Sequence, residues 1–238
     1  MNNTDFYVNP REEIELLIRE NNLKKLLIMS AQIHGHFCHG IALGVYAAVR
    51  GMNYINESAD GLEDLISIVE TNNCFSDGIQ FVTGCTFGNN SLIFKDFGKL
   101  ALTISLRNGK GIRISELNTS KEKIRSTFPG FSEEFKKLVS EKNHSEKAKE
   151  DFKKAGYKAA LNILSLDFDN LFKIEEVVIK LPPYAPSHKS IICDICNENT
   201  MSTRIVSKGN KKLCIACSGE SHFQLDGYGI SKNKSSKT

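Results

Sequence analysis

Two Cys-x-x-Cys pairs near the C-terminus constrain the fold of this chain more than any other feature of its sequence. Cys193 and Cys196 form the first pair, Cys214 and Cys217 form the second, and seventeen residues separate the pairs. This spacing is typical of zinc sites in which two tight turns each present two thiolates and together complete a tetrahedral four-cysteine site. Four thiolates fill the coordination sphere, so we predict a structural Zn²⁺ with no open position for substrate.

The segment that holds these cysteines is short and poor in apolar residues, so we expect the metal to supply its folding energy. Redox-active or chance pairs are the alternatives, but two correctly spaced pairs behind the proline-rich residues 182–186 favour zinc. Lys208, Gly209 and Asn210 predict a hairpin turn between the pairs, in a basic stretch. We expect this hairpin to contact a protein partner or nucleic acid, and the lack of aromatic residues among the basic ones favours protein.

Seven cysteines in 238 residues exclude a fully paired set of intramolecular disulfides. The N-terminal sequence lacks the features of a signal peptide, and no window reaches the roughly 18 consecutive apolar residues of a membrane span. We therefore expect a cytoplasmic protein with no membrane partner, in which thiols stay reduced and serve metal binding or catalysis. A net charge of +3 and 40% hydrophobic residues indicate a globular protein, and by themselves indicate no nucleic-acid partner.

Hydrophobic periodicity predicts alternating regions of helix and strand. The predicted helices cover residues 11–30, 41–50, 59–70 and 132–166, with a weak point at Asn21-Asn22 and a stop at Gly51. The predicted strands cover residues 78–83, 91–95, 99–106, 111–115 and 172–181. The first four strands predict an antiparallel meander, with a hairpin turn at Asn108-Gly109.

A second group of metal-ligating side chains lies in the segment HGHFCHG, residues 34–40. If this segment is extended, His34, His36 and Cys38 project to the same side, because side chains alternate along a strand. Imidazole and thiolate together suit zinc or a related transition metal. Cys38 also precedes the predicted helix at residues 41–50, and a helix N-terminus lowers the pKa of a thiol. Metal ligation and a reactive thiol are therefore both open at this position.

Cys74 and Cys85 frame a third segment of interest, CFSDGIQFVTGC. Each cysteine taken alone is typical of a small buried core residue. Gly84 before Cys85, at the end of a predicted strand, would let a ligand or another backbone approach closely. The nearby carboxylates of Glu70 and Asp77 are of a kind that most often serves as helix caps or surface charges.

These segments resemble the signatures of the formylmethanofuran dehydrogenase FmdE family. HGHFCHGIALG is similar to the family motif H-G-H-x-C-P-G-x-x-x-G, with His39 in place of the proline. CFSDGIQFVTGCTFG and the later DFGK are similar to the patterns C-x-x-D-x-I-Q-x-x-T-G-C-T-x-G and D-Y/F-G-K. The C-terminal cysteines resemble the zinc ribbon of many members, whereas residues 116–180 match only in predicted helix content.

The resemblance implies an α+β fold, with helices packed on an antiparallel sheet plus a small C-terminal zinc ribbon, assembled as a homodimer. We divide the chain into a core over residues 1–185, a ribbon over 186–225 and a flexible tail over 226–238. The resemblance also implies a core cavity that binds Zn²⁺ or another transition metal. The implied metal ligands are His34, His36, Cys38, Cys74 and Cys85, and the implied pocket residues are Asp77, Thr83 and Lys99. His39 adds a nitrogen near this site, which leaves the ligand set open.

Three functions fit these residues. The first is a metal-dependent protein that binds or converts a small molecule in one-carbon or molybdenum/tungsten-enzyme metabolism, with Cys38 or Cys85 as candidate catalytic thiols. The second is a metal-responsive regulator whose ribbon contacts nucleic acid or a partner protein. The third is an accessory protein that docks on a dehydrogenase complex. The sequence favours the first as a metal-binding protein and leaves catalysis open.

Overall fold

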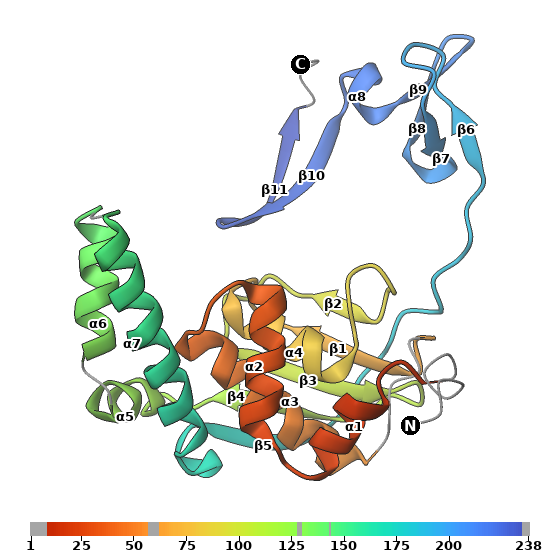
Figure 1. Cartoon of the computed structure of the whole chain (residues 1–238). Helices are drawn as coiled ribbons and strands as arrows, with labels where there is room; N and C mark the ends of the chain where they lie inside the picture. The colour runs from red at the N-terminus through yellow and green to blue at the C-terminus, as the bar shows by residue number, and fades with distance from the viewer. Residues whose placement is uncertain (1–8, 57–61, 128–129, 143, 235–238) are drawn as a thin grey trace. The chain divides into compact units, whose positions relative to one another are not determined.

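The computed structural model describes residues 9–56, 62–127, 130–142 and 144–234 (Figure 1). The chain forms two compact units, Met1–Pro182 and Pro183–Thr238. This division lies within the proline-rich segment, just before the boundary that we expected after residue 185. Among the residues that the structure describes, no helix combines the length and apolar character needed to cross a membrane.

The first unit is an α+β core built on one five-stranded sheet. Its main elements are α1 (Glu12–Arg19), α2 (Leu23–His34), α3 (His39–Ile55), β1 (Leu65–Val69), α4 (Cys74–Thr83), β2 (Leu92–Phe94), β3 (Ala101–Leu106), β4 (Lys110–Glu116), α5 (Ser120–Thr127), α6 (Gly130–Phe135), a π-helix (Lys136–Ser140), α7 (Glu146–Leu164), a 3-10 turn (Phe168–Asn170) and β5 (Phe172–Val178). The strand order is β2-β1-β3-β4-β5. The α+β class is thus confirmed.

The sheet is mixed, not antiparallel as we expected. β1 runs parallel to β2, with Ser67 paired to Leu92, whereas the β1–β3, β3–β4 and β4–β5 pairs are antiparallel. The physical reason is the connection between β1 and β2. It passes through α4, and a crossover helix of this kind returns the chain to the starting end of the sheet.

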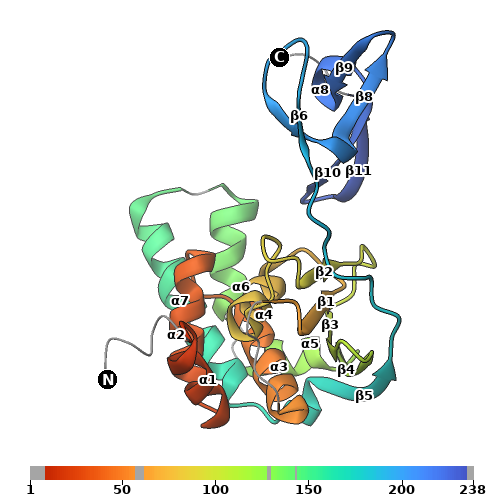
Figure 2. The same cartoon turned by 90° about the vertical axis from the view of Figure 1, so that its right-hand side faces the viewer.

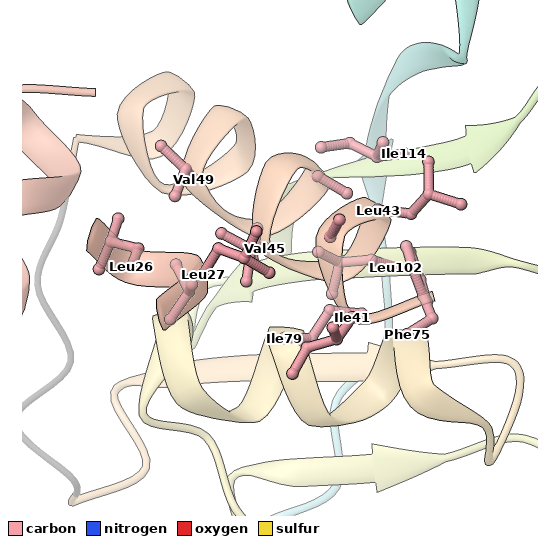
Figure 3. Packing of buried hydrophobic residues seen from close by; sticks show 14 of the residues in the cluster. Leu26, Leu27, Ile41, Leu43, Val45, Val49, Phe75, Ile79, Leu102 and Ile114 are labelled. Carbon is pink, nitrogen blue, oxygen red and sulfur yellow. The ribbon is translucent and has the colours of Figure 1, made fainter. Parts of the chain in front are cut away.

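The core lies where α2, α3 and α4 meet one another and the sheet. Figure 3 shows Leu27 of α2, Val45 of α3 and Ile79 of α4 in this cluster, together with Leu102 and Ile114 of the sheet. All five side chains are almost completely buried. The N-terminal ends of α3 and α4 are therefore held by a continuous apolar core.

Two glycines let α3 and α4 approach to backbone contact. A Cβ on Gly44 would lie 2.1 Å from the carbonyl oxygen of Phe75, and one on Gly78 would lie 2.6 Å from the carbonyl oxygen of Ile41. No larger residue fits either position without moving a helix. This close crossing fixes where the first residues of α4 lie relative to the first residues of α3.

Two predicted elements are wrong in type. The helix predicted over residues 59–70 contains β1, all of whose residues are buried, and residues 57–61 lie outside the described part. A strand that is covered on both faces is apolar throughout and shows no alternation of apolar and polar residues. Periodicity therefore cannot distinguish it from a buried helix. The strand predicted over residues 78–83 is the end of α4, which begins where the Asn73 side chain accepts from the Phe75 N–H at 3.0 Å.

The helix stop predicted at Gly51 is also wrong, because α3 continues to Ile55 and ends at Asn56, whose φ is 55°. Gly51 instead faces the sheet, where a Cβ would lie 2.7 Å from Cδ1 of Ile104. The predicted weak point between the first helices is confirmed, since Asn21 adopts φ 54° between α1 and α2.

The remaining predicted strands are present as β2, β3, β4 and β5, and Gly109 adopts φ 82° at the predicted hairpin turn. The single helix predicted over residues 132–166 is divided into α6, the π-helix and α7.

The described part of the second unit consists of short strands and two short helical turns (Figure 2). Its elements are β6 (Ser190–Ile192), β7 (Asn199–Met201), a 3-10 turn (Ser202–Arg204), β8 (Ile205–Lys208), β9 (Lys211–Cys214), α8 (Ile215–Ser218), β10 (Ser221–Asp226) and β11 (Gly229–Lys234). They pair as β6–β7, β8–β9 and β10–β11. The turn predicted at Lys208-Gly209-Asn210 joins β8 to β9, with Gly209 at φ 58°.

The segment that we expected to be a flexible tail contains a strand. β11 pairs with β10 over six residues, and the ladder joins Phe223 to Lys232 and Leu225 to Ile230. Polar side chains dominate this stretch of sequence, so its strand character comes from pairing with β10 and not from a hydrophobic pattern. Residues 235–238 lie outside the described part.

Candidate metal centres

His34, His36 and Cys38 come together at the junction of α2 and α3. Their metal-ligating atoms all lie within 4.8 Å of one another. α2 ends at His34, and Gly35 turns the chain at φ 86° so that the following residues fold back toward the helix end. Cys38 then forms the N-cap of α3. A helix end and a tight turn thus produce the convergence that we expected from an extended segment.

Cys74, the first residue of α4, joins this group. A Cβ on Gly40 would lie only 2.7 Å from the Cβ of Cys74, so the two helix N-termini meet at this glycine. The thiols of Cys38 and Cys74 share a hydrogen bond, and His34 also bonds Cys74. The hydrogen bond from Cys38 lowers the pKa of Cys74 to about 6, and the neighbouring His34 supports this shift against the effect of burial. The same hydrogen bond and burial raise the pKa of Cys38.

Asp77 orients His34 from the same helix as Cys74. Its Oδ2 lies 2.8 Å from Nδ1 of His34, which directs Nε2 toward the thiol of Cys38 at 3.7 Å. A carboxylate behind a histidine fixes the ring and raises its basicity, as in many metal sites. Burial and the adjacent His34 lower the pKa of His36, so this ring is neutral and able to donate a lone pair to a metal.

The ligating atoms of His34, His36 and Cys38 converge, and Cys74 adjoins them through its hydrogen bonds to Cys38 and His34. We call these four residues, His34, His36, Cys38 and Cys74, the core cluster. This donor set suits a transition metal of borderline softness. Binding by all four would close a tetrahedral site, whereas binding by three would leave a position for water or a ligand.

The structure does not bring Cys85 to the core cluster, although we predicted it as a ligand and as a candidate catalytic thiol. Cys85 lies beyond the C-terminal end of α4, about 15 Å along the helix from Cys74 at 1.5 Å per residue. Its side chain is buried and donates to the carbonyl oxygen of Leu65 at 3.4 Å. Burial raises the pKa of Cys85, which keeps the thiol protonated and unreactive. Geometry and protonation thus both argue against the predicted roles.

The other predicted pocket residues lie elsewhere. The Thr83 hydroxyl donates to the Ile79 carbonyl at 2.8 Å and accepts from the Cys85 N–H at 3.2 Å, so it closes the end of α4. Lys99 is exposed, and its backbone N–H donates to the Glu70 carbonyl at 2.9 Å. Of the three predicted pocket residues, Asp77 is the one that contacts the core cluster.

Glu70 has a structural role that its sequence context did not reveal. It is 5% exposed and accepts from Arg113 at 2.7 and 2.9 Å, which is a bidentate ion pair across the end of the sheet. Arg113 holds the pKa of Glu70 below its usual value, against the effect of burial. The pairing could not be predicted, because the residues of β1 were expected to form a helix, and only the pairing of β1 with β3 brings Glu70 near β4.

A cavity of about 520 Å³ opens at the N-terminal ends of α3 and α4. His39 and Asn73 line it, each adjacent in the chain to a cysteine of the cluster. Burial lowers the pKa of His39, so its ring is neutral. The cavity is also lined by Lys121 and Arg125 of α5, which no motif or spacing in the sequence connects with the metal ligands.

The four ribbon cysteines form the second candidate centre. The sulfur atoms of Cys193, Cys196, Cys214 and Cys217 all lie within 4.8 Å of one another. Backbone N–H groups point at these sulfurs: Cys214 N–H donates to the sulfur of Cys193, and Cys217 N–H donates to the sulfur of Cys214, each at 3.3 Å. Hydrogen bonds from backbone N–H groups, of which that of Cys196 has the largest effect, lower the pKa of the Cys193 thiol to about 6. The unit is consistent with a small zinc ribbon.

An α+β core with a His/Cys cluster, followed by a four-cysteine ribbon, defines a class of two-part proteins with two candidate metal centres. The family model described as "FmdE, Molybdenum formylmethanofuran dehydrogenase operon" matches residues 33–173, which include the whole core cluster. The chain belongs to the FmdE family.

Two known proteins resemble this chain in sequence or in fold. The chain is 35% identical over 219 residues to a "Probable S-adenosyl-L-methionine-binding protein" of Archaeoglobus fulgidus, and the match covers 90% of this chain but 57% of that relative. A crystal structure of a tungsten formylmethanofuran dehydrogenase FmdE-like protein from Syntrophus aciditrophicus aligns with a TM-score of 0.52. That match covers 83% of this chain and 92% of the other at 21% identity, so it shows the fold alone.

Proposed function

We propose that the protein binds Zn²⁺ in the core cluster and uses this centre to bind or convert a small molecule. The observation that carries the proposal is the convergence of the ligating atoms of His34, His36 and Cys38, with Cys74 hydrogen-bonded to this group and Asp77 behind His34. Two imidazoles and two thiols are a common donor set for zinc. Family membership supports a place in one-carbon or molybdenum/tungsten-enzyme metabolism.

The bound zinc would be held by His34, His36 and Cys38, which leaves its fourth position open. As a Lewis acid the zinc would polarise a ligand atom bound there. Asp77 would keep Nε2 of His34 directed at the metal and prevent the ring from rotating. Cys74 enters the site as a thiolate near neutral pH, because the hydrogen bond from Cys38 lowers its pKa to about 6. A second zinc in the ribbon would be purely structural. We also propose that the protein works in the cytoplasm and that it forms a homodimer. Sedimentation of the full chain tests the oligomeric state.

S-adenosyl-L-methionine is a reasonable first ligand to test, because the relative from Archaeoglobus fulgidus is named for it. This chain spans only 57% of the length of that relative, so the shared part need not be the part that binds the ligand. Calorimetric titration of the metal-loaded chain with S-adenosyl-L-methionine measures whether the shared part is sufficient.

Metal content per chain tests the core centre. We expect two zinc ions in the wild type and one in the Cys38→Ser/Cys74→Ser double variant, with the ribbon ion retained. Cys85→Ser is the matched control, because it removes a buried core thiol that lies outside the cluster and should leave both ions in place. If the double variant keeps two ions, or Cys85→Ser loses one, the proposed ligand set is wrong.

A second candidate function is recognition of single-stranded nucleic acid by the ribbon unit. On β10–β11 the exposed Phe223 pairs directly with Lys232, and the exposed Tyr228 lies at the turn. Residues 183–238 contain eight Lys and Arg against four Asp and Glu. Aromatic residues are absent from the sequence of β8–β9 but present on this second hairpin, and the combination of aromatic and basic side chains favours base stacking with phosphate contact.

Fluorescence anisotropy with a labelled single-stranded oligonucleotide tests this function. We expect affinity that falls steeply with salt, and a further loss of about tenfold or more in Phe223→Ala, because a stacked base contributes about 1–3 kcal/mol. Ser231→Ala, on the opposite face of the same hairpin, is the control. Binding that does not change with salt, or equal effects of the two substitutions, would exclude this function.

A further inference from the structure

We infer that the cavity beside the core cluster binds a small organic anion, a carboxylate or a phosphate monoester, through Lys121 and Arg125. The inference rests on the proposed function, because it assigns the ligand class of the same centre. It commits to a chemical class that neither the family description nor the name of either relative specifies.

The position of the cavity connects it with the metal ligands. His39 is the first residue of α3 and follows Cys38, and Asn73 is the N-cap of α4 and precedes Cys74. The wall formed by His39 and Asn73 is thus continuous with the backbone that presents the two cysteines. A ligand in the cavity would contact the residues that follow Cys38 and precede Cys74, and would lie near the core cluster without touching its four side chains.

The charges that line the cavity favour an anion. Lys121 and Arg125 are four residues apart on α5, so both side chains lie on one face of the helix. Within the described ranges of the chain, neither makes an ion pair. Among the described lining residues Glu116 is the one carboxylate, and it already accepts a hydrogen bond from the Ser120 hydroxyl at 2.5 Å. Two cations and one occupied carboxylate leave net positive charge in the cavity.

The size and the apolar surface of the cavity indicate an organic ligand and not a bare inorganic ion. A volume of about 520 Å³ lies within the roughly 300–1,000 Å³ of small-molecule sites. Leu43, Leu100 and Ile124 supply apolar lining to the same cavity. An anionic group held by Arg125 and Lys121 would leave the body of the ligand against these side chains.

The N-terminal ends of two helices reinforce this selectivity. α3 begins at His39 and α4 at Cys74, and both present the positive end of their dipoles to this region. These dipoles add to the positive charge of Lys121 and Arg125. The charge of these two side chains is the main reason to expect an anion. A cationic or neutral ligand would gain nothing from this arrangement.

Titration of the isotope-labelled, zinc-loaded full chain by NMR tests the inference with three probes. Butyrate and butyl phosphate carry the anionic groups, and butyramide is the neutral counterpart of butyrate. We expect the better anion to bind about tenfold or more tightly than butyramide, since charge-assisted hydrogen bonds are about twice as strong as neutral ones. The stronger of the two anions identifies the ligand class as phosphate or carboxylate.

The Lys121→Met/Arg125→Met double variant should lose this preference. Lys147→Met/Lys158→Met is the matched control, because it removes two exposed lysines from α7, none of whose described residues line the cavity. If butyramide binds as tightly as both anions, or if the cavity variant keeps the preference, the inference is wrong. Metal content measured on the same samples distinguishes zinc binding by the core cluster from anion binding by the cavity. If Cys38→Ser/Cys74→Ser loses zinc but the wild type shows no preference for anions, only the inference of an anion site is wrong.

Discussion

Replacing Gly44 by alanine should destabilise the core, although alanine is the better helix former. Gly44 lies inside α3, where alanine in place of glycine gains about 1 kcal/mol in helix propensity. Against this gain, the new Cβ would lie 2.1 Å from the carbonyl oxygen of Phe75 and 3.0 Å from its carbonyl carbon. Both atoms belong to the backbone of α4, so no side-chain rotation relieves the overlap.

The magnitude follows from these two opposing terms. An acceptable contact requires α4 to move away by about 1 Å, and overpacking of this kind typically costs about 1–3 kcal/mol. With the upper end of that range for a backbone clash, the net loss is about 2 kcal/mol. For a folding unit of this size we expect the melting temperature to fall by about 4–8 °C. Because α4 carries Cys74 and Asp77, the same movement should also reduce zinc occupancy of the core cluster.

Gly51→Ala is the matched control in the same helix. It gains the same propensity, but its Cβ would meet only the Cδ1 and Cγ1 atoms of isoleucine side chains, chiefly Cδ1 of Ile104 and Ile114, which are flexible ends. Differential scanning calorimetry of the zinc-loaded variants, with metal analysis, measures both effects. If Gly44→Ala melts at or above the wild-type temperature, or if Gly51→Ala loses as much stability, backbone contact at Gly44 does not hold the two helices in place.

Three further predictions follow from individual contacts. Cys214→Ser should release the ribbon zinc and unfold the second unit while the core keeps its thermal transition, and collapse of both units together would show that they fold as one. Asp77→Asn should weaken binding of the core zinc by about 10–100-fold, because the amide is a poorer acceptor for the His34 ring, and a competition titration with a chelator measures the change. Glu70→Gln should cost about 2 kcal/mol at pH 7, because Arg113 loses its buried anionic partner. The pKa of Glu70 is lowered on folding, so its contribution is complete above the unfolded value near 4.5 and is lost as the pH falls below it. Melting temperatures of wild type and Glu70→Gln should therefore converge in acid, and a constant difference down to about pH 2 would contradict this account.

The ligands of both centres could be found in the sequence because their spacing is local. A Cys-x-x-Cys turn needs only four residues to present two thiols, and the segment from His34 to Cys38 is five residues long. The convergence of ligands this close in sequence is predicted correctly even when the secondary structure is not. The three core ligands meet at a helix end and a turn, although we expected an extended segment. The strands β3 and β4 could be predicted for the same reason, since a tight turn at Gly109 joins them.

What could not be predicted depends on tertiary contacts. The apolar runs in β1 and α4 are each compatible with helix and strand, and burial on both faces of β1 removed the pattern that would distinguish them. The predicted place of Cys85 in the site rests on the family resemblance and not on a local pattern, and α4 carries Cys74 and Cys85 to opposite ends of one element. Lys121 and Arg125 could not be found, because only the folded core brings α5 to the start of α3.

The glycines of α3 and α4 explain why two segments distant in sequence form one centre. Without Cβ atoms at Gly40, Gly44 and Gly78, the two helices can cross at backbone contact, and their N-terminal ends then meet at Cys38 and Cys74. A larger side chain at any of these glycines would separate the two thiols before it disturbed the core as a whole. The metal centre therefore depends on the helix crossing as much as on its ligands, and variants of the glycines should lose core zinc at a smaller cost in stability than variants of buried leucines such as Leu27.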